Sequence, residues 1–255
     1  MANEPVISVI IPVYSGSHLL DRAIRSALCQ EVHMEIIVIN DCSAEDVDAV
    51  MAPYRDHEAV VYLKNARNMG AAESRNRGVA QAKGRYVAFL DADDYWLEGK
   101  LSKQLALLEE TGHVLCATAR ELIRPDGTPV GRVIPVPEVI TYRTLLKHNC
   151  ISCSSVLMRR DAALEFPMHH AQDSHEDYIL WLEVLQKYRT ARGINEPLLR
   201  YTASDQGKSG SKLQSAGMTL RVYRYMGFGP VKSALCFLSY AFHGVWKHYF
   251  GPKAK

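Results

Sequence analysis

Four short apolar segments, each followed by a stretch of helical character, fill the first 110 residues of this 255-residue chain. The first, residues 6–11, reads VISVII and ends at Pro12. Such a nearly continuous β-branched run is typical of a strand buried on both faces of a parallel sheet. The order therefore predicts an α/β fold with a doubly wound, mostly parallel sheet flanked by helices. The expected strands are 6–11, 35–39, 60–63 and 85–90, and the expected helices are 21–30, 44–54, 71–82 and 97–110.

The second half predicts a mixture of strands and helices. Strands joined by a turn at Pro125-Asp126-Gly127 are expected over 114–132. A short helix over 142–148, a strand over 154–158 and a helix over 177–188 follow. A soft boundary near residue 205 separates a main domain, 1–205, from a tail, 206–255.

The tail has a basic and amphipathic character. From residue 198 to the end it carries nine Lys or Arg and one Asp, which leaves 21 basic and 27 acidic residues before it. His243 and Lys247 argue against a membrane-spanning helix, whereas aromatic residues and basic flanks suit one that lies at a membrane surface. Packing against the body or a partner chain is the alternative. The apolar stripe consists of Val231, Leu235, Leu238, Phe242, Val245 and Tyr249, and 218–226 is expected at a helix surface.

The segment Asp91-Ala92-Asp93-Asp94 directly follows the fourth predicted strand. Three carboxylates at the end of a buried strand repel one another and lower stability unless a cation lies between them. Mg²⁺ and Mn²⁺ prefer oxygen ligands and leave room for substrate phosphates. The cluster therefore predicts a divalent metal site, and a solvated acidic loop is the alternative.

Polar residues also follow the second and third predicted strands. Asp41 is expected to point its carboxylate into the crevice at the strand ends, while Ser43 and Asp46 form a capping box for the next helix. After the third strand, Asn68-Met69-Gly70 leads into a helix that carries Arg75 and Asn76. An amide, a guanidinium and a flexible glycine at this edge favour an anionic ligand, although a surface helix start explains them equally well.

A further acidic pair, Glu176-Asp177, stands at the start of the 177–188 helix. Ser174 and Asp177 form a second candidate capping box. A carboxylate here could equally act as a general base that takes the proton of an attacking hydroxyl group. The spacing does not choose between Glu176 and Asp177.

Together these motifs resemble glycosyltransferase family 2, whose members have the GT-A fold and invert configuration at the transferred sugar. The resemblance covers about residues 6–205, and Asn40 and Cys42 stand where the family often has Asp and Gly. It rests on residues 9–14 (VIIPVY), 40–43, 68–76, 91–94 and 176–177.

The resemblance implies a site for a UDP-sugar donor. Pro12, Val13 and Tyr14 would pack on the nucleoside, Asp41 would read the uracil, and Arg75 would lie near the base or the phosphates. The remaining implied donor residues are Asn68, Gly70, Asp91, Ala92 and Asp93.

The resemblance also implies the reacting groups. Asp93 would hold the ribose or the metal, Asp94 or Asp93 would hold Mn²⁺ or Mg²⁺, and Asp177 would be the base, with Glu176 as the other candidate. The tail is similar to that of members that build capsule, teichuronic-acid and O-antigen chains on lipid carriers. The loop 204–210 lacks a clear His ligand, and its Lys208 is expected to close over the diphosphate.

These observations predict a metal-dependent, inverting glycosyltransferase of bacterial surface polysaccharide synthesis that uses a lipid-linked or other glycan acceptor. Residues 1–110 would bind the donor and 111–205 the acceptor, while the tail would touch the membrane or pair chains into a homo-oligomer. The absence of a secretory signal predicts a cytoplasmic protein at the inner face of the cell membrane. The modest net charge of +2 speaks against nucleic acid as a partner.

Two other functions use similar residues. A sugar-nucleotide nucleotidyltransferase needs a Gly-rich phosphate loop after the first strand, but residues 12–17 read PVYSGS, and no cation follows until Arg22. A non-catalytic glycan-binding protein on the same fold is the second alternative.

Overall fold

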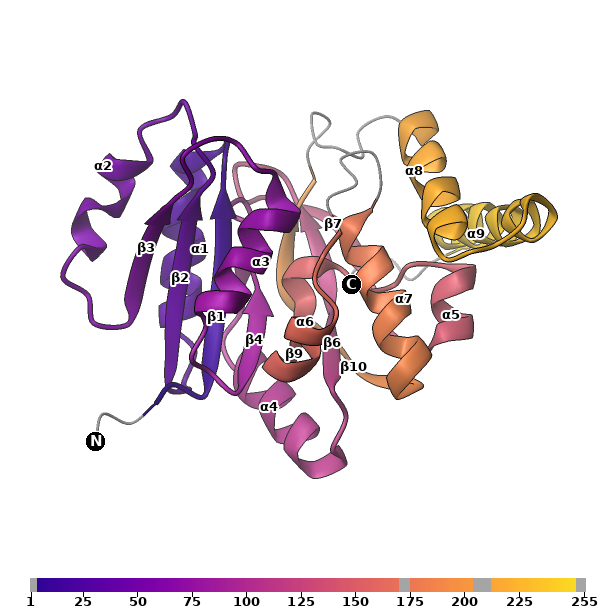
Figure 1. Ribbon diagram of the computed structural model, residues 1–255, viewed down its shortest axis with the longest axis horizontal. Coiled ribbons are helices and arrows are strands. Elements are labelled where there is room, and N and C mark those ends of the chain that lie inside the picture. The colour runs from indigo at the N-terminus through magenta and orange to yellow at the C-terminus, as the bar shows by residue number, and fades with distance from the viewer. Residues whose placement is uncertain (1–3, 170–174, 204–211, 251–255) are drawn as a thin grey trace.

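The predicted strands of the first half form the parallel part of one large sheet (Figure 1). The computed structural model describes residues 4–169, 175–203 and 212–250. In it β1 lies between β2 and β4, and β3 pairs with the outer side of β2. This arrangement confirms the predicted doubly wound sheet. The strands are β1 (Ile7–Val13), β2 (Met34–Asn40), β3 (Val60–Lys64) and β4 (Tyr86–Phe89).

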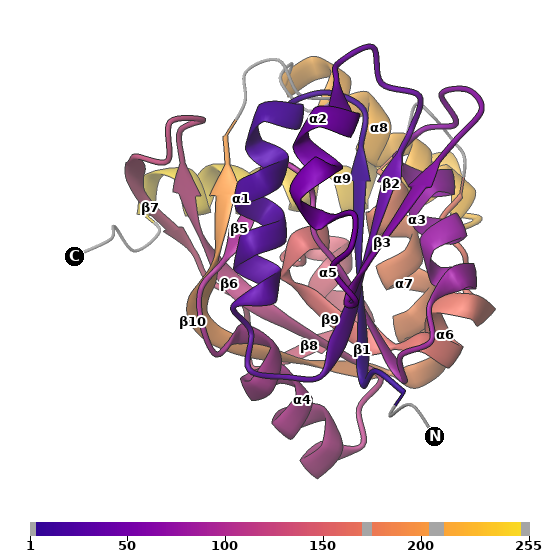
Figure 2. The same ribbon diagram turned by 90° about the vertical axis from the view of Figure 1, so that its left-hand side faces the viewer.

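Helices cover both faces of this sheet (Figure 2). On one face α1, α2 and α4 pack against a core that includes Val9 and Val38, and on the other α3 packs against Ile10 and Ile37. Because successive side chains of a strand point to opposite faces, both faces of β1 and β2 are apolar and buried. The helices are α1 (Ser17–Leu28), α2 (Val47–Met51), the 3₁₀ turn η1 (Ala52–Tyr54), α3 (Ala71–Gln81) and α4 (Lys100–Thr111).

The second half extends the sheet with strands of both directions. The order continues from β4 through β9, β6 and β10 to β5, with β9 antiparallel to both neighbours and β6 parallel to β10. The elements are β5 (Tyr95–Trp96), β6 (Leu115–Ile123), β7 (Pro129–Ile134), β8 (Val139–Thr141), α5 (Tyr142–Lys147), η2 (Cys153–Ser155), β9 (Val156–Arg159), α6 (Arg160–Glu165), α7 (Glu176–Tyr188) and β10 (Thr190–Thr202).

Two local predictions at the first helices are wrong. Helix α1 begins at Ser17, four residues before the expected start, because the Glu45 carboxylate accepts hydrogen bonds from the backbone N–H groups of Gly16 (3.0 Å) and Ser17 (2.6 Å). The expected capping box is absent from α2, whose N-cap is Asp46, accepting from the N–H of Ala49. A carboxylate 28 residues away thus supplies the cap that a local pattern could not reveal.

Pro12 does not end β1 as predicted. Leu90 donates its N–H to the carbonyl of Ile10 from the β4 side, whereas Asp41 donates to Val13 from the β2 side. Pro12 therefore faces β4, where pairing with β1 has already stopped at Ile10. A residue without an N–H leaves no hydrogen bond unmade there, and the strand continues.

Strand β10 was not predicted, because Gly193 and Pro197 interrupt its sequence. Its pairing with β6 shifts register on both sides of Pro197, which lets the strand pass the proline. A side chain on Gly193 would come within 2.0 Å of the Pro137 carbonyl oxygen, so the close approach of the two backbones requires glycine.

The tail forms two helices, α8 (Lys212–Tyr225) and α9 (Pro230–Phe250). Val222 and Tyr223 of α8 are fully buried, so the expectation that 218–226 lies at a helix surface is wrong. Helix α9 packs Phe237 and Tyr240 on the body. Its outer face exposes the first three residues of the predicted stripe, Val231, Leu235 and Leu238, by 63–75%.

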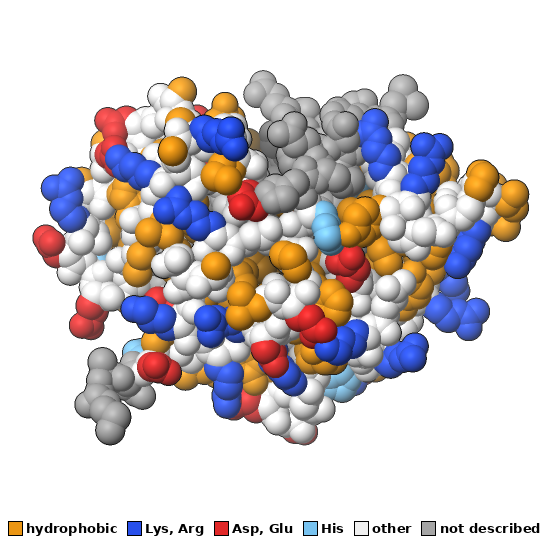
Figure 3. All heavy atoms as spheres, viewed as in Figure 1, with side chains coloured by type: hydrophobic (Ala, Val, Ile, Leu, Met, Phe, Trp, Pro, Cys, Tyr) orange, Lys and Arg blue, Asp and Glu red, His pale blue; other side chains and the backbone are white. Residues whose placement is uncertain are grey.

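Hydrophobic side chains and basic residues lie together at the end of the molecule that α8 and α9 form (Figure 3). The side chains of Phe242, Val245 and Tyr249, like Ser174 and the 204–210 loop with Lys208, lie outside the described residues. Within the described part of the chain, no helix is long and apolar enough to cross a membrane.

Candidate active site

A cavity of about 230 Å³ opens at the carboxyl ends of β1, β2 and β4. In doubly wound sheets this edge, where the strand order reverses beside β1, is the usual ligand crevice. Eight of the ten predicted donor residues line it, and Ser15 and Ala71 line it without having been predicted. The eight are Pro12, Val13, Tyr14, Asp41, Arg75, Asp91, Ala92 and Asp93.

Asp41 lies at the β2 end of this cavity with its carboxylate held by the protein. Its Oδ1 accepts hydrogen bonds from Asn65 Nδ2 (2.7 Å) and the Met69 N–H (2.8 Å), and its Oδ2 accepts from the Gly70 N–H (2.8 Å). The residue is only 2% exposed. Three donors balance the buried charge, so the carboxylate is fixed before any ligand arrives.

Asn68 and Gly70 do not line the cavity. The Asn68 side chain accepts a hydrogen bond from the Gly70 N–H, and Gly70 has φ +85°, a conformation that glycine adopts without strain. These two residues shape the loop that donates to Asp41. Their predicted role in donor binding is thus indirect in this geometry.

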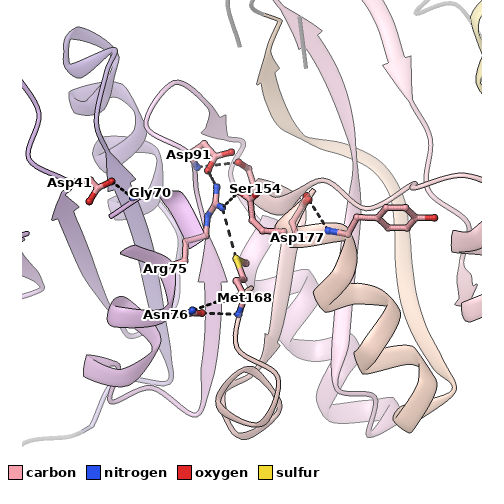
Figure 4. A network of polar contacts seen from close by, with 10 residues as sticks. Asp41, Gly70, Arg75, Asn76, Asp91, Ser154, Met168 and Asp177 are labelled. Atoms are coloured by element: carbon pink, nitrogen blue, oxygen red, sulfur yellow. Dashed lines mark hydrogen bonds and ion pairs between the residues drawn. The ribbon is translucent and has the colours of Figure 1, made fainter. Parts of the chain in front are cut away.

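Arg75 lines the cavity, but its guanidinium is engaged with the carboxylate of Asp91 (Figure 4) and with that of Glu176. Nη2 lies 2.5 Å from Asp91 Oδ1, and Nη1 lies 3.3 Å from Glu176 Oε1. Arginine suits such a position because its planar fork can bind two acceptors at once. The expected contact of Arg75 with a base or phosphate therefore competes with these ion pairs.

The Asp91–Asp94 segment places its carboxylates at different depths. Asp91 and Asp93 line the cavity, whereas Asp94 is 1% exposed and accepts a hydrogen bond from the Thr202 N–H (2.8 Å) on Oδ1. Burial, with the neighbouring Asp91 carboxylate, raises the pKa of Asp93 to about 6. Burial and the carboxylates of Asp93 and Asp91 raise the pKa of Asp94 well above its usual range.

A divalent cation fits this cluster. Asp94 Oδ2 is buried without a hydrogen-bond partner among the described residues, and the raised pKa values reflect uncompensated negative charge. Hard oxygen donors of this kind suit Mg²⁺ or Mn²⁺. No group of three His, Cys, Asp or Glu side chains within the described ranges could enclose a metal. Phosphate oxygens and water would complete the shell around an ion held by Asp93, which lines the cavity, and Asp94 behind it.

Glu176 and Asp177 begin α7 but make different contacts. Glu176 is paired with Arg75, whereas Asp177 accepts a hydrogen bond from its own neighbour, the Tyr178 N–H (2.8 Å). No cation is paired with Asp177 in the described part of the chain. Burial, together with the Glu176 carboxylate, raises the pKa of Asp177, which makes it a stronger base than an ordinary aspartate.

The tail packs close to the start of α7. The Tyr240 ring of α9 stacks on His148 at 5.9 Å between ring centroids and lies 6.2 Å from the ring of Tyr178, the residue after Asp177. Burial and the charge of Asp177 raise the pKa of Tyr240. The tail, which the sequence predicted as a separate unit, thus packs against the residue next to Asp177.

Several residues around the cluster had no signal in the sequence. Arg22 Nη2 donates to the Asp93 carbonyl (2.7 Å), and Ser154 Oγ accepts from the Asp91 N–H (3.1 Å). Thr202 Oγ1 also donates to the Asp93 carbonyl. Each lies 63 or more residues from its partner, so only a comparison of related sequences could have marked them.

The chain is similar to known proteins over most of its length. The model of the family "Glycosyl transferase family 2" matches residues 8–166. TuaG of Bacillus subtilis, named as a teichuronic acid biosynthesis glycosyltransferase, is 35% identical over 96% of this chain and 98% of its own length. WfaP of Escherichia coli, named as a UDP-Glc:α-D-GlcNAc-diphosphoundecaprenol β-1,3-glucosyltransferase, is 32% identical over 98% of both chains.

Solved structures share the fold. TarS of S. aureus in complex with UDP has a TM-score of 0.68 at 17% identity and covers 96% of this chain and 72% of its own. The mannosyltransferase PcManGT of Pyrobaculum calidifontis, in complex with GDP-Man and Mn²⁺, has a TM-score of 0.68 at 14% identity over 98% and 72%. The predicted GT-A type of fold is confirmed by these neighbours.

Proposed function

The chain belongs to glycosyl transferase family 2 and is a glycosyltransferase, and from that premise we propose that it moves a sugar from a UDP-sugar to a hydroxyl group of a lipid-linked glycan in the synthesis of a bacterial surface polysaccharide. The observation that carries the proposal is the full-length similarity to WfaP, which is named for a UDP-Glc donor and a diphosphoundecaprenol-linked acceptor. Membership of this family speaks against the nucleotidyltransferase alternative, and measured turnover would exclude the glycan-binding one.

In this proposal the cavity at the strand ends holds the donor. Tyr14, 52% exposed at its rim, offers a ring to the nucleoside, and the fixed carboxylate of Asp41 reads the uracil. Asp93, with Asp94 behind it, would hold Mn²⁺ or Mg²⁺, and the bound ion would neutralise the charge that develops on the departing diphosphate. Residues 1–110 thereby serve the donor and 111–205, with the tail, the acceptor.

Asp177 acts as the base. The acceptor oxygen forms a bond to the anomeric carbon while the bond from that carbon to the diphosphate breaks on the opposite face, which inverts the configuration. The hydroxyl proton passes to the Asp177 carboxylate, and UDP leaves. Glu176 is the weaker candidate for this role because its carboxylate is paired with Arg75.

The test is UDP release from a panel of UDP-sugars, with and without Mn²⁺ or Mg²⁺ and a GlcNAc-diphospholipid acceptor. Asp177→Asn should lower turnover by about 10²- to 10⁴-fold and leave UDP binding intact. Asp161→Asn, at an exposed carboxylate of α6, is the matched control. Wild-type protein that binds UDP yet transfers nothing would support a binder, and turnover with only GDP- or dTDP-sugars would exclude the uracil contact of Asp41.

The exposed stripe of α9 is proposed to rest on an anionic membrane at the cytoplasmic face, where lipid-linked acceptors are available. Val231, Leu235 and Leu238 project from the body, Lys232 lies beside them, and the chain from residue 198 onward carries nine Lys or Arg and one Asp. Apolar burial and attraction to anionic lipid act together in such helices.

Sedimentation with anionic vesicles tests this contact. Changing Val231, Leu235 and Leu238 together to Ser should abolish co-sedimentation, whereas Leu164→Ser, at an exposed apolar residue of α6, should not. Loss of dimers instead of vesicle binding would mean that the stripe joins two chains.

A further inference from the structure

Arg75 and Asn76 are adjacent on α3, and both side chains leave the donor half to contact the segment that leads to α7 (Figure 4). Arg75 connects two carboxylates from separate parts of the fold: Asp91, in the loop after β4, and Glu176, the first residue of α7. Its side chain is 6% exposed. A buried guanidinium between two acids holds both in place, because separating either would leave a charge unpaired.

Asn76 makes a second, uncharged connection. Its Nδ2 donates to the Met168 carbonyl (2.8 Å), and its Oδ1 accepts from the Met168 N–H (2.8 Å). The amide thus binds the backbone of Met168 through both of its polar groups. Since Met168 is 2% exposed and lies three residues after α6, this pair fixes the chain beyond α6 to α3.

We propose that Arg75 and Asn76 are positioning residues that hold the start of α7, and with it the base Asp177, at a set place relative to the donor cavity. The inference rests on the proposed function of Asp177 as the base. Neither residue needs to touch the acceptor in order to act.

The physical reason is the sensitivity of group transfer to geometry. The acceptor hydroxyl must meet the anomeric carbon in line, and a misplacement of about 1 Å lowers the rate by about 10²-fold. The donor is held by the loops after β1, β2 and β4, whereas Asp177 lies on a helix from the other half of the chain. Contacts from α3 to Asp91 and to Glu176 limit the movement of the start of α7 relative to the donor cavity.

The Arg75 ion pairs also set the electrostatic surroundings of Asp177. The Glu176 carboxylate raises the pKa of Asp177, whereas His175 and the Arg75 guanidinium lower it. Among the described residues, Cys153 of η2 and Tyr240 of α9 also interact with the charge of Asp177. Removing Arg75 or Glu176 should therefore move the same titration in opposite directions.

Asn76→Ala is the decisive variant, because Asn76 touches neither the cavity lining nor Asp91. We expect kcat for transfer to fall about 10- to 100-fold while UDP affinity stays at the wild-type value. The control is Arg85→Ala, which removes an exposed ion pair with Glu109 at the opposite end of β4. A wild-type kcat in Asn76→Ala, or an equal loss of kcat and UDP affinity, would overturn the proposal.

A second experiment compares the pH dependence of transfer in Arg75→Gln and Glu176→Gln. The acid limb of the rate profile should move to higher pH in Arg75→Gln and to lower pH in Glu176→Gln, a pattern that simple loosening of the fold does not produce. Titration of the Asp177 carboxyl by ¹³C NMR in the UDP-bound protein reports these shifts without transfer. Shifts in one direction only, or none, contradict the inference, whereas inactive wild-type protein with the expected NMR shifts contradicts only the proposed transfer.

Discussion

Two acidic sites lie at the same edge of the sheet, one after β2 and one after β4, and the protein satisfies them differently. Asp41 receives three hydrogen bonds from donors of the chain. Asp93 and Asp94 crowd against Asp91, with pKa values raised by burial and by one another. The first site is therefore complete without a ligand, whereas the second stores repulsion that a cation would relieve.

The comparison teaches that two buried carboxylates can have opposite effects on stability. A carboxylate that accepts several N–H groups stabilises the fold, and its removal leaves donors unpaired. A carboxylate held beside others destabilises the fold unless a cation binds between them. In the proposed function, donor recognition and charge neutralisation fall to neighbouring strand ends.

Of the changes that test this comparison, Asp93→Asn should have the largest effect. Transfer should fall about 10²- to 10³-fold because the proposed ligand for the metal is lost. The free energy of unfolding should stay the same or rise, since one source of repulsion is gone. Metal-dependent UDP release and urea unfolding measure both quantities, and a clear loss of stability would break the comparison.

Asp41→Asn, in contrast, should lower the stability of the fold. An amide cannot accept all three N–H donors, so the unfolding free energy should fall by about 1–3 kcal/mol, and UDP affinity should fall as the 65–70 loop loosens. Calorimetric UDP titration and urea unfolding test this. Asp46→Asn, at the N-cap of α2, is the control, because Asn and Asp cap helices about equally well.

Lys100 extends the comparison to a buried cation away from the cavity. It is fully buried over the Trp96 ring, donates to Gln104 Oε1 (2.7 Å), and has no carboxylate partner among the described residues. Burial lowers its pKa from 10.5 to about 7. Between these values the unfolded chain binds the extra proton, so stability should rise with pH by ~1.4 kcal/mol per unit.

Lys100→Met should remove this pH dependence without changing transfer. Lys103, on the same helix as Lys100, is exposed and pairs with Glu196 of β10. Lys103→Met should leave the pH dependence in place. Urea unfolding at pH 7 to 10 distinguishes the two variants. An identical slope in the wild type and Lys100→Met would mean that Lys100 keeps its proton in the fold.

The smallest effect is expected at Cys42, directly after Asp41. Its φ of +58° lies in the left-handed region that favours glycine, so Cys42→Gly should stabilise the protein by about 0.5 kcal/mol. Thermal unfolding measures the difference. Lower stability would show that the thiol contributes packing that outweighs the backbone strain.

The sequence by itself determined the parallel half of the fold and most of the cavity lining. Apolar runs such as 35–39 are local signals, and the rule that ligands bind at strand ends turns them into a site containing Asp41 and Asp93. The family motifs sharpened this outline. Such inferences succeed because strand burial and strand-end position depend on nearby residues.

Only the tertiary structure decided which side chains meet across the molecule. Arg75 pairs with Glu176 over 101 residues, Glu45 caps a helix 28 residues away, and the Tyr240 ring of the tail lies 6.2 Å from that of Tyr178. Strand β10 forms despite Gly193 and Pro197. Its pairing with β6 shifts register around Pro197, and the Pro137 backbone packs closely against Gly193. These outcomes depend on packing between distant segments, which no local pattern of residues encodes.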